Sequence, residues 1–131
     1  HQIRMDGGRL IIDDCYNANP QAMAEALRML AKSRHRRKLA VVGDMGELGE
    51  LTEQAHRDVG TLARELGLDG VIAIGEKMRA LQKADPSALW FPDVPAALPA
   101  LRERFTPDTA VLVKASHAMH FENIVKELEK L

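Results

Sequence analysis

Short apolar runs alternate with stretches whose apolar residues recur at helical spacing, and this alternation constrains the fold more than any other feature of the chain. The clearest apolar runs lie at 10–12, 39–42, 71–74 and 110–113. Helix-like segments separate them, for example the one in which Met23, Leu27 and Leu30 fall on one face. Strands that alternate with helices are typical of βα units, whose strands lie parallel beneath covering helices.

The remaining segments complete an α/β, Rossmann-like fold with helices on both faces of a mostly parallel sheet of about six strands. Residues 2–5 and 10–12 are expected to pair as a hairpin around Asp6-Gly7-Gly8, which makes the N-terminal strand the one antiparallel strand. A weaker strand is expected at 89–91. Helices are expected at 52–66, at 77–83, at 94–105 and from 121 to the C-terminus, and Pro99 indicates that the third of these starts later or is broken.

Size and charge narrow the class of protein. The 131 residues, 46% of them apolar, suit one domain spanning 1–131. The net charge of −1 gives no electrostatic footprint for nucleic acid, and we interpret the basic segment 32–38 as a solvated helix end. No apolar run is long enough for a membrane span. The single cysteine, Cys15, cannot form an internal disulfide, which fits a reducing, cytoplasmic location.

Several common catalytic and cofactor motifs are absent from the sequence. It contains no G-x-x-x-x-G-K-[ST] phosphate loop, no G-x-G-x-x-G and no G-x-S-x-G. The glycine-rich segment 43–49 contains Asp44 and Glu47, and their carboxylates would repel a pyrophosphate. His117 and His120 alone do not make a zinc site, so no metal site is predicted in this chain.

The segment 13–20, Asp-Asp-Cys-Tyr-Asn-Ala-Asn-Pro, places polar groups at a strand-to-helix turn, where open α/β sheets bind ligands. Asp13 and Asp14 point to opposite faces of the strand, so only one of them should face a ligand. Asn19 is a good N-cap and Pro20 suits the first helical position. The free N–H groups of that helix suit anionic oxygen.

Three segments together resemble the Mur ligase family, and specifically the members that add D-alanyl-D-alanine: 13–20, then 41–49 with His56 and 59–60, then 111–116 with Met119 and Glu122. The resemblance covers essentially the whole chain and implies the C-terminal domain of a three-domain, ATP-dependent ligase in peptidoglycan precursor synthesis. The N-terminal domain, which holds the UDP-sugar, and the central domain, which holds the phosphate loop and Mg²⁺, are expected outside this chain. The implied enzyme is a cytoplasmic bacterial monomer that joins D-alanyl-D-alanine to UDP-N-acetylmuramoyl-tripeptide, and the isolated chain is expected to be inactive.

The resemblance also implies roles for individual residues, none of them catalytic within this chain alone. The nucleotide would be contacted by Asp14, Tyr16, Asn17 and Asn19. The D-alanyl-D-alanine substrate would be contacted by Lys114, Ser116, His117, Asp44 and Glu47. The family commonly has Lys-Gly-Ser-Arg where this chain has Lys114-Ala115-Ser116-His117, so the fixed cation of that arginine is missing.

Simpler structural roles remain open for the same residues. Asp14 can cap the turn that follows it, and Asn19 suits a helix cap better than a ligand contact. Asp44 and Glu47 can be solvated turn carboxylates, and His56 fits a packed or capping histidine better than a base. Two other functions also remain open: a non-catalytic Rossmann-like binding module, and the same domain in a sibling ligase that adds a single amino acid or, in a folylpolyglutamate-type enzyme, glutamate.

Overall fold

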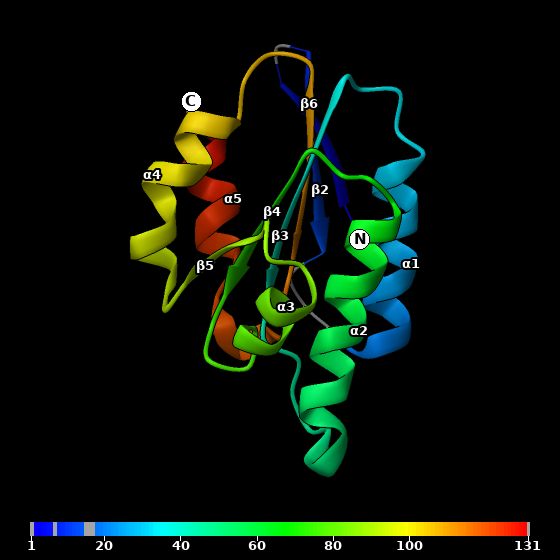
Figure 1. The fold of residues 1–131 in the computed structure, drawn as a ribbon. Coiled ribbons are helices and arrows are strands. Elements are labelled where there is room, and N and C mark those ends of the chain that lie inside the picture. The colour runs from blue at the N-terminus through cyan, green and yellow to red at the C-terminus, as the bar shows by residue number, and fades with distance from the viewer. Residues whose placement is uncertain (1, 7, 15–17, 131) are drawn as a thin grey trace.

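The computed structural model describes the backbone of residues 2–6 and, with their side chains, residues 8–14 and 18–130 apart from the side chain of residue 117. A six-stranded sheet with the order β1-β2-β6-β3-β4-β5 forms the centre, and helices cover both of its faces (Figure 1). The strands are β1 (Gln2–Asp6), β2 (Arg9–Asp14), β3 (Arg37–Gly43), β4 (Gly70–Ile74), β5 (Leu89–Phe91) and β6 (Thr109–Lys114). The predicted α/β, Rossmann-like class is confirmed.

Pairing in the sheet is parallel from β2 through β5, while β1 pairs antiparallel with β2. The helices are α1 (Pro20–Ala31), α2 (Thr52–Glu65), α3 (Arg79–Ala84), α4 (Val94–Arg104) and α5 (Glu122–Glu129), with short 3-10 turns at Gly49–Leu51 and His117–Met119. Helix α3 begins two residues later than predicted because residues 75–78 form a hydrogen-bonded turn instead.

Two apolar layers hold the helices to the sheet. Because neighbouring side chains on a strand point to opposite faces, Ile12 and Leu112 pack under α1 and α2, whereas Ile11 and Val111 pack under α4 and α5. Both faces are therefore buried, which explains why these strands are continuous apolar runs rather than alternating ones. The stripes predicted for α1 and α5 are buried as expected.

Helix α1 is fixed at both ends by its own sequence. The Asn19 side chain accepts a hydrogen bond from the Ala22 N–H at 2.8 Å, and Pro20 occupies the first turn. At the other end, Lys38 Nζ donates to the carbonyl of Ala31. The prediction that the basic segment 32–38 is a solvated helix end holds in part: α1 ends at Ala31 and Lys32 caps it, but Arg37 and Lys38 already belong to β3.

The prediction that α4 starts late or breaks at Pro99 was wrong. The helix runs without interruption from Val94 to Arg104, with Pro99 inside it. Asp93 Oδ1 accepts a hydrogen bond from the Ala96 N–H at 3.0 Å, which fixes the start, and Pro95 fits the first turn. Pro99 removes one helical hydrogen bond, and the burial of Ala97 and Leu101 against the sheet offsets that loss.

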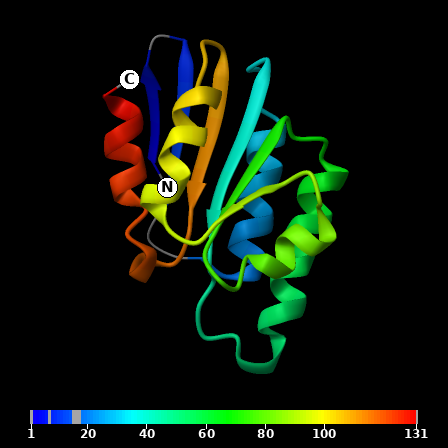
Figure 2. The same cartoon turned by 60° about the vertical axis from the view of Figure 1, so that its left-hand side comes forward.

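The path of the chain creates a crevice at the carboxyl end of β6. Strands β2 and β3 lead into α1 and α2 on one face, whereas β6, which lies between them, leads into α5 on the opposite face (Figures 1 and 2). Ligands of open α/β sheets bind at such a switch point. Across residues 2–6, 8–14 and 18–130, none of the helices combines the length and apolar character that crossing a membrane requires.

Candidate functional site

An ion pair occupies the switch point. Lys114 Nζ lies 2.6 Å from Asp14 Oδ2, with the ammonium donating to the carboxylate. The two residues are register partners at the ends of β6 and β2, so the parallel sheet itself brings them together across 100 positions of sequence. The Lys114 side chain is only 1% exposed and the Asp14 side chain 22% exposed. The carboxylate is therefore the part of the pair that borders solvent.

The two neighbouring aspartates separate as predicted. Asp14 lies on the same face as Ile12, toward α1, because residues two apart on a strand share a face. Asp13 pairs in register with Val113, whose side chain belongs to the opposite layer, and Asp13 is itself buried. Of the two, Asp14 is the one that lies on the α1 face of the sheet and at the switch point.

Three of the predicted site residues lie partly or wholly outside the described residues. These are Tyr16 and Asn17, together with the side chain of His117, and the same holds for Cys15. Asn19 is described: its side-chain oxygen caps α1, the role that the sequence favours, while the residue is exposed at the mouth of the switch point.

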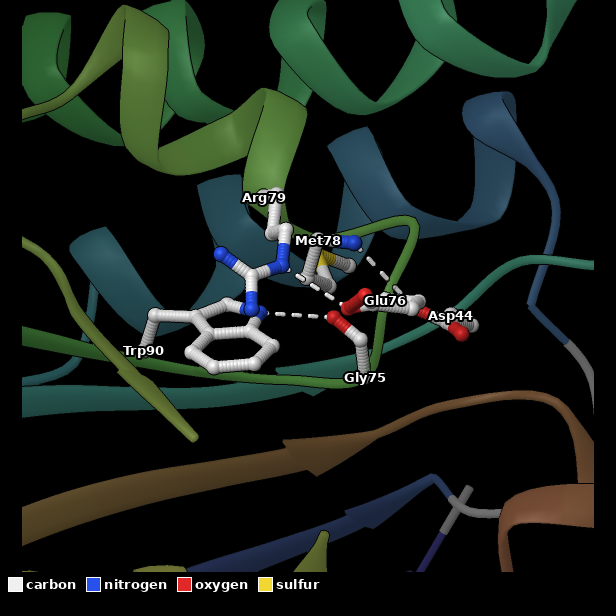
Figure 3. Close-up of polar contacts among 6 residues, drawn as sticks. All are labelled: Asp44, Gly75, Glu76, Met78, Arg79 and Trp90. Atoms are coloured by element: carbon white, nitrogen blue, oxygen red, sulfur yellow. Dashed lines mark hydrogen bonds and ion pairs between the residues drawn. The ribbon is translucent and has the colours of Figure 1, made fainter. Parts of the chain in front are cut away.

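The loop after β3 is tied to its neighbours through Asp44. Its backbone carbonyl accepts a hydrogen bond from the Ser116 N–H at 3.2 Å. Its Oδ1 accepts one from the Met78 N–H at 3.2 Å, which Figure 3 shows. Asp44 thus joins the loops that follow β3, β4 and β6. Burial raises the pKa of the Asp44 carboxyl above its usual 3.8, against the opposing effect of His56 and of the backbone N–H groups of Lys77 and Met78.

The raised pKa of Asp44 predicts a pH-dependent effect on stability. Since the folded-state pKa exceeds the unfolded one, ionisation of Asp44 costs folding free energy, and the cost sets in as the pH rises above about 3.8. Asp44→Asn keeps an oxygen that can accept from Met78 and removes this cost. We expect the melting temperature of the variant, relative to the parent, to rise between pH 3 and pH 7 in a thermal scan.

Glu127→Gln serves as the control with the opposite sign. Lys130 and Arg102 lower the pKa of the partly exposed Glu127 carboxyl below 4.5, so its stabilising effect is present above that pH and fades as the pH falls. The relative melting temperature of Glu127→Gln should therefore fall slightly from pH 3 to pH 7. A relative melting temperature of Asp44→Asn that stays flat or falls over this interval would contradict the assignment.

His56 anchors the same loop from α2. It is fully buried, its Nε2 accepts a hydrogen bond from the Met45 N–H at 3.0 Å, and its Nδ1 lies 2.6 Å from the Thr52 carbonyl. A carbonyl can only accept, so Nδ1 is the donor in the contact with Thr52. His56 therefore acts as the packed histidine that the sequence favours, and it holds the backbone next to Asp44.

Glu47 is exposed at the tip of this loop, with a left-handed φ of 59°. A non-glycine residue in that conformation is uncommon and is found preferentially where a loop is held for function. Ser116 is half-buried and contributes its N–H to Asp44. The structure thus places Asp44, Glu47 and Ser116 on two adjoining loops, while Lys114 pairs with Asp14.

Sequence reasoning missed the loop after β4, which contacts the Asp44 carboxylate through the Met78 N–H (Figure 3). The Arg79 guanidinium stacks over the Trp90 ring at 3.9 Å and pairs with Glu76 at 2.8 Å. Trp90 Nε1 donates to the Gly75 carbonyl at 2.7 Å. The signal in the sequence was Gly75 directly after a buried strand, the same pattern that marks Gly43 after β3.

The chemistry of these groups fits part of a nucleotide. A partly exposed carboxylate such as that of Asp14 accepts hydrogen bonds from hydroxyl groups and suits a sugar. A triphosphate instead needs a cradle of backbone N–H groups and cations. Within 8–14 and 18–130, no three His, Cys, Asp or Glu side chains gather as metal ligands. The residues present thus fit the sugar side of a nucleotide site, and the described part of the chain offers no cluster for a metal.

The fold and the residues at the switch point describe an α/β domain with part of a nucleotide site, and sequence comparison assigns this domain to a family. The sequence model of the family described as "Mur ligase, glutamate ligase domain" matches residues 1–117. The chain belongs to the Mur ligase family.

Individual relatives narrow this to one branch, and the chain corresponds to the C-terminal domain of its members. The chain is 34% identical over 130 residues to a UDP-N-acetylmuramoyl-tripeptide–D-alanyl-D-alanine ligase of Escherichia coli K12, covering 98% of this chain and 28% of the relative. It superposes on MurF from Acinetobacter baumannii with a TM-score of 0.92 and 31% identity, over 99% of this chain and 29% of that one. MurF ligase from Thermotoga maritima in complex with ADP gives a TM-score of 0.84 and 32% identity, over 98% and 30%.

The chain therefore spans somewhat more than a quarter of the length of the relatives it matches. The matched part is the whole of the fold described above, including the switch point with Asp14 and Lys114. The predicted membership in this family, read from the three motif segments, is confirmed.

Proposed function

We propose that this chain is the C-terminal domain of an ATP-dependent ligase that joins D-alanyl-D-alanine to UDP-N-acetylmuramoyl-tripeptide in peptidoglycan precursor synthesis. The observation that carries the proposal is the 34% identity to a ligase of this specificity over 98% of the chain. The alternative, a non-catalytic binding module, has no comparable support, since the relatives named above are ligases. The same relatives favour this specificity over a sibling ligase.

The proposed reaction has two steps. ATP phosphorylates the tripeptide carboxylate, which gives an acyl phosphate and ADP. The neutral amine of D-alanyl-D-alanine then attacks the acyl carbon, and the tetrahedral intermediate expels phosphate to leave an amide. Because water would hydrolyse the acyl phosphate, the reaction needs a domain that closes over the site and holds the amine close to the acyl carbon.

This domain would supply two sides of that closed site. On the nucleotide side, Asp14 would accept hydrogen bonds from ribose hydroxyls, near Tyr16, Asn17 and Asn19. The triphosphate and Mg²⁺, which would neutralise the transferring phosphoryl group, would be held mainly by a central domain outside this chain. The proposed unit is one domain spanning residues 1–131 within a monomeric, cytoplasmic bacterial enzyme.

On the dipeptide side, the loops that follow β3 and β6 adjoin through the hydrogen bond from the Ser116 N–H to the Asp44 carbonyl. Ser116 and His117 would face the dipeptide carboxylate, and Glu47, at its strained and exposed position, would face the ammonium end. Asp44 would fix the loop after β3 against the loops after β6 and β4, because it accepts hydrogen bonds from the Ser116 N–H and the Met78 N–H. The proposed role of this side is to orient the amine, with proton transfer and phosphoryl chemistry left to groups outside the chain.

A domain exchange tests the function directly. In the Escherichia coli ligase, the segment that matches this chain is replaced by residues 1–131, and amide formation is measured by mass spectrometry with ATP, UDP-N-acetylmuramoyl-tripeptide and D-alanyl-D-alanine. We expect the chimera to ligate. The two separated parts, each assayed alone, should give no product, because neither holds both halves of the site.

The isolated 131-residue chain gives a second test of the same proposal. We expect no amide ligation and no micromolar ATP binding in calorimetric titration, because the larger part of the nucleotide site would lie in another domain. Robust ligation by the isolated chain would contradict the proposed division of labour. A folded chimera that makes no product, beside an active parent ligase, would count against the proposed function itself.

A further inference from the structure

The buried lysine at the switch point has a geometry that a direct substrate contact does not need. Lys114 is fully buried at 1% exposure, and its ammonium is 2.6 Å from the Asp14 carboxylate. Its aliphatic stem continues the apolar face that Leu112 and Ala110 present beneath α1. A long side chain that reaches outward from a strand end to a ligand would be exposed in the open domain, and this one is not.

Stability alone does not explain why the Lys114–Asp14 ion pair is buried. Burying an ammonium carries a large desolvation penalty, and a buried ion pair is often no more stabilising than apolar residues of similar size. An apolar pair at these positions would extend the core already formed by Ile12 and Leu112, which are the preceding register partners on the same face. The charge of Lys114 at this position therefore calls for a role beyond packing.

We propose that Lys114 is a positioning residue that acts on the nucleotide only through Asp14, an inference that rests on the proposed function. The ammonium holds Asp14 Oδ2 from inside the sheet, which fixes the rotamer of the carboxylate. Asp14 is the more exposed partner, at 22%, and presents the rest of its carboxylate to a pair of neighbouring ribose hydroxyls. A carboxylate anchored in this way accepts both hydroxyls without losing side-chain freedom on binding.

This assignment separates Lys114 from the dipeptide side of the site. The Ser116 N–H donates to the Asp44 carbonyl, and both residues lie in loops just beyond the ends of β6 and β3, whereas Lys114 and Asp14 are the last residues of their strands. Lys114 thus belongs to the nucleotide side, although it shares a segment with Ser116. The distinction can be measured, because the two substrates have separate Michaelis constants.

A double-mutant cycle in the chimeric ligase tests the inference. The variants are Lys114→Met, which removes the charge and keeps an unbranched apolar stem, Asp14→Asn, and the double variant. We expect Lys114→Met to raise the Michaelis constant for ATP about tenfold, as for the loss of one charge-assisted contact, and to leave that for D-alanyl-D-alanine within about twofold. In the Asp14→Asn background, Lys114→Met should have no further effect on the ATP constant.

Two matched variants sharpen the result. Lys114→Arg keeps the charge and should recover part of the ATP effect, since a guanidinium can still hold the carboxylate. Lys126→Met changes an exposed lysine on α5 and should alter neither Michaelis constant. A rise in the constant for D-alanyl-D-alanine on Lys114→Met, or effects of the two substitutions on the ATP constant that simply multiply, would overturn the inference while leaving the proposed function intact.

The isolated chain provides a readout that does not depend on ligase activity. Asp14→Asn leaves the Lys114 ammonium buried without its carboxylate, and we expect its melting temperature to fall by about 10 °C. The double variant should lose less than Asp14→Asn alone, because it also removes the buried ammonium that the Asp14 carboxylate held. If the two single losses add in the double variant, the pair is not coupled and the inference fails, whatever the chimera does.

Discussion

Replacing Gly75 with alanine is expected to destabilise the folded chain by about 3–5 kcal/mol, the sum of backbone strain and a lost buried contact. Gly75 has a φ of +114°, outside the range that an L-residue adopts readily. A Cβ placed on it would lie 2.6 Å from Asp44 Cγ and in closer contact still with Asp44 Oδ1. The Asp44 carboxylate would have to leave, and with it the hydrogen bond from the Met78 N–H.

Gly67→Ala is the matched control for Gly75→Ala. Gly67 also has a positive φ, +65°, but open space surrounds the position of its missing Cβ. Its substitution therefore measures backbone strain alone, which we expect to cost about 1–2 kcal/mol in urea unfolding. If Gly75→Ala is no more destabilising than Gly67→Ala, then the approach of Asp44 to Gly75 does not contribute and the proposed link between the loops after β3 and β4 is wrong.

The fold could be predicted from the sequence because the signals for its strands and helices are local. The strands β2, β3, β4 and β6 each contain a continuous apolar run, and α1 carries its own start signal in Asn19 and Pro20. The prediction of a late start or a break near Pro99 was wrong because it considered the proline without its tertiary contacts. The cap from Asp93 and the burial of Leu101 sustain a helix that propensity alone would interrupt.

Only part of the candidate site could be predicted from the sequence, because its contacts join segments that are distant along the chain. The motif segments located Asp14, Lys114 and Asp44 at strand ends, but which of these side chains contact one another depends on strand order. The order places β6 beside β2, and so pairs Lys114 with Asp14. Asp44 instead meets Met78, whose loop carries no recognisable motif. Long-range register of this kind cannot be read from one sequence.

The glycines of the segment 43–49 have structural reasons that do not involve phosphate. Gly49 adopts a positive φ of +56°, whereas open space surrounds Gly46. Gly43 ends β3 where the chain after β6 crosses it, and a Cβ on Gly43 would lie 2.5 Å from Phe121 Cζ and 2.8 Å from Ala115 Cβ. The glycine spacing that resembles a dinucleotide-binding loop therefore has two separate causes: the positive φ of Gly49 and the close packing of other residues against Gly43.

Gly43→Ala is consequently expected to destabilise the fold by about 2–3 kcal/mol, although alanine in a strand interior is normally more favourable than glycine. Phe121 and Ala115 are both fully buried, so neither can yield without moving its backbone. Movement at Ala115 would shift Ser116, whose N–H donates to the Asp44 carbonyl, and we expect ligation by the chimera to fall with stability.

Gly46→Ala, three residues along in the same segment, provides the control and should change the free energy of unfolding by no more than about 0.5 kcal/mol. Because the steric conflict at Gly43 is chiefly with the Phe121 ring, Gly43→Ala combined with Phe121→Leu should be more stable than the sum of the two single losses predicts. Equal effects of Gly43→Ala and Gly46→Ala would instead mean that both glycines serve loop flexibility. In that case the close packing of β3 against the segment after β6 would not be what positions Ser116.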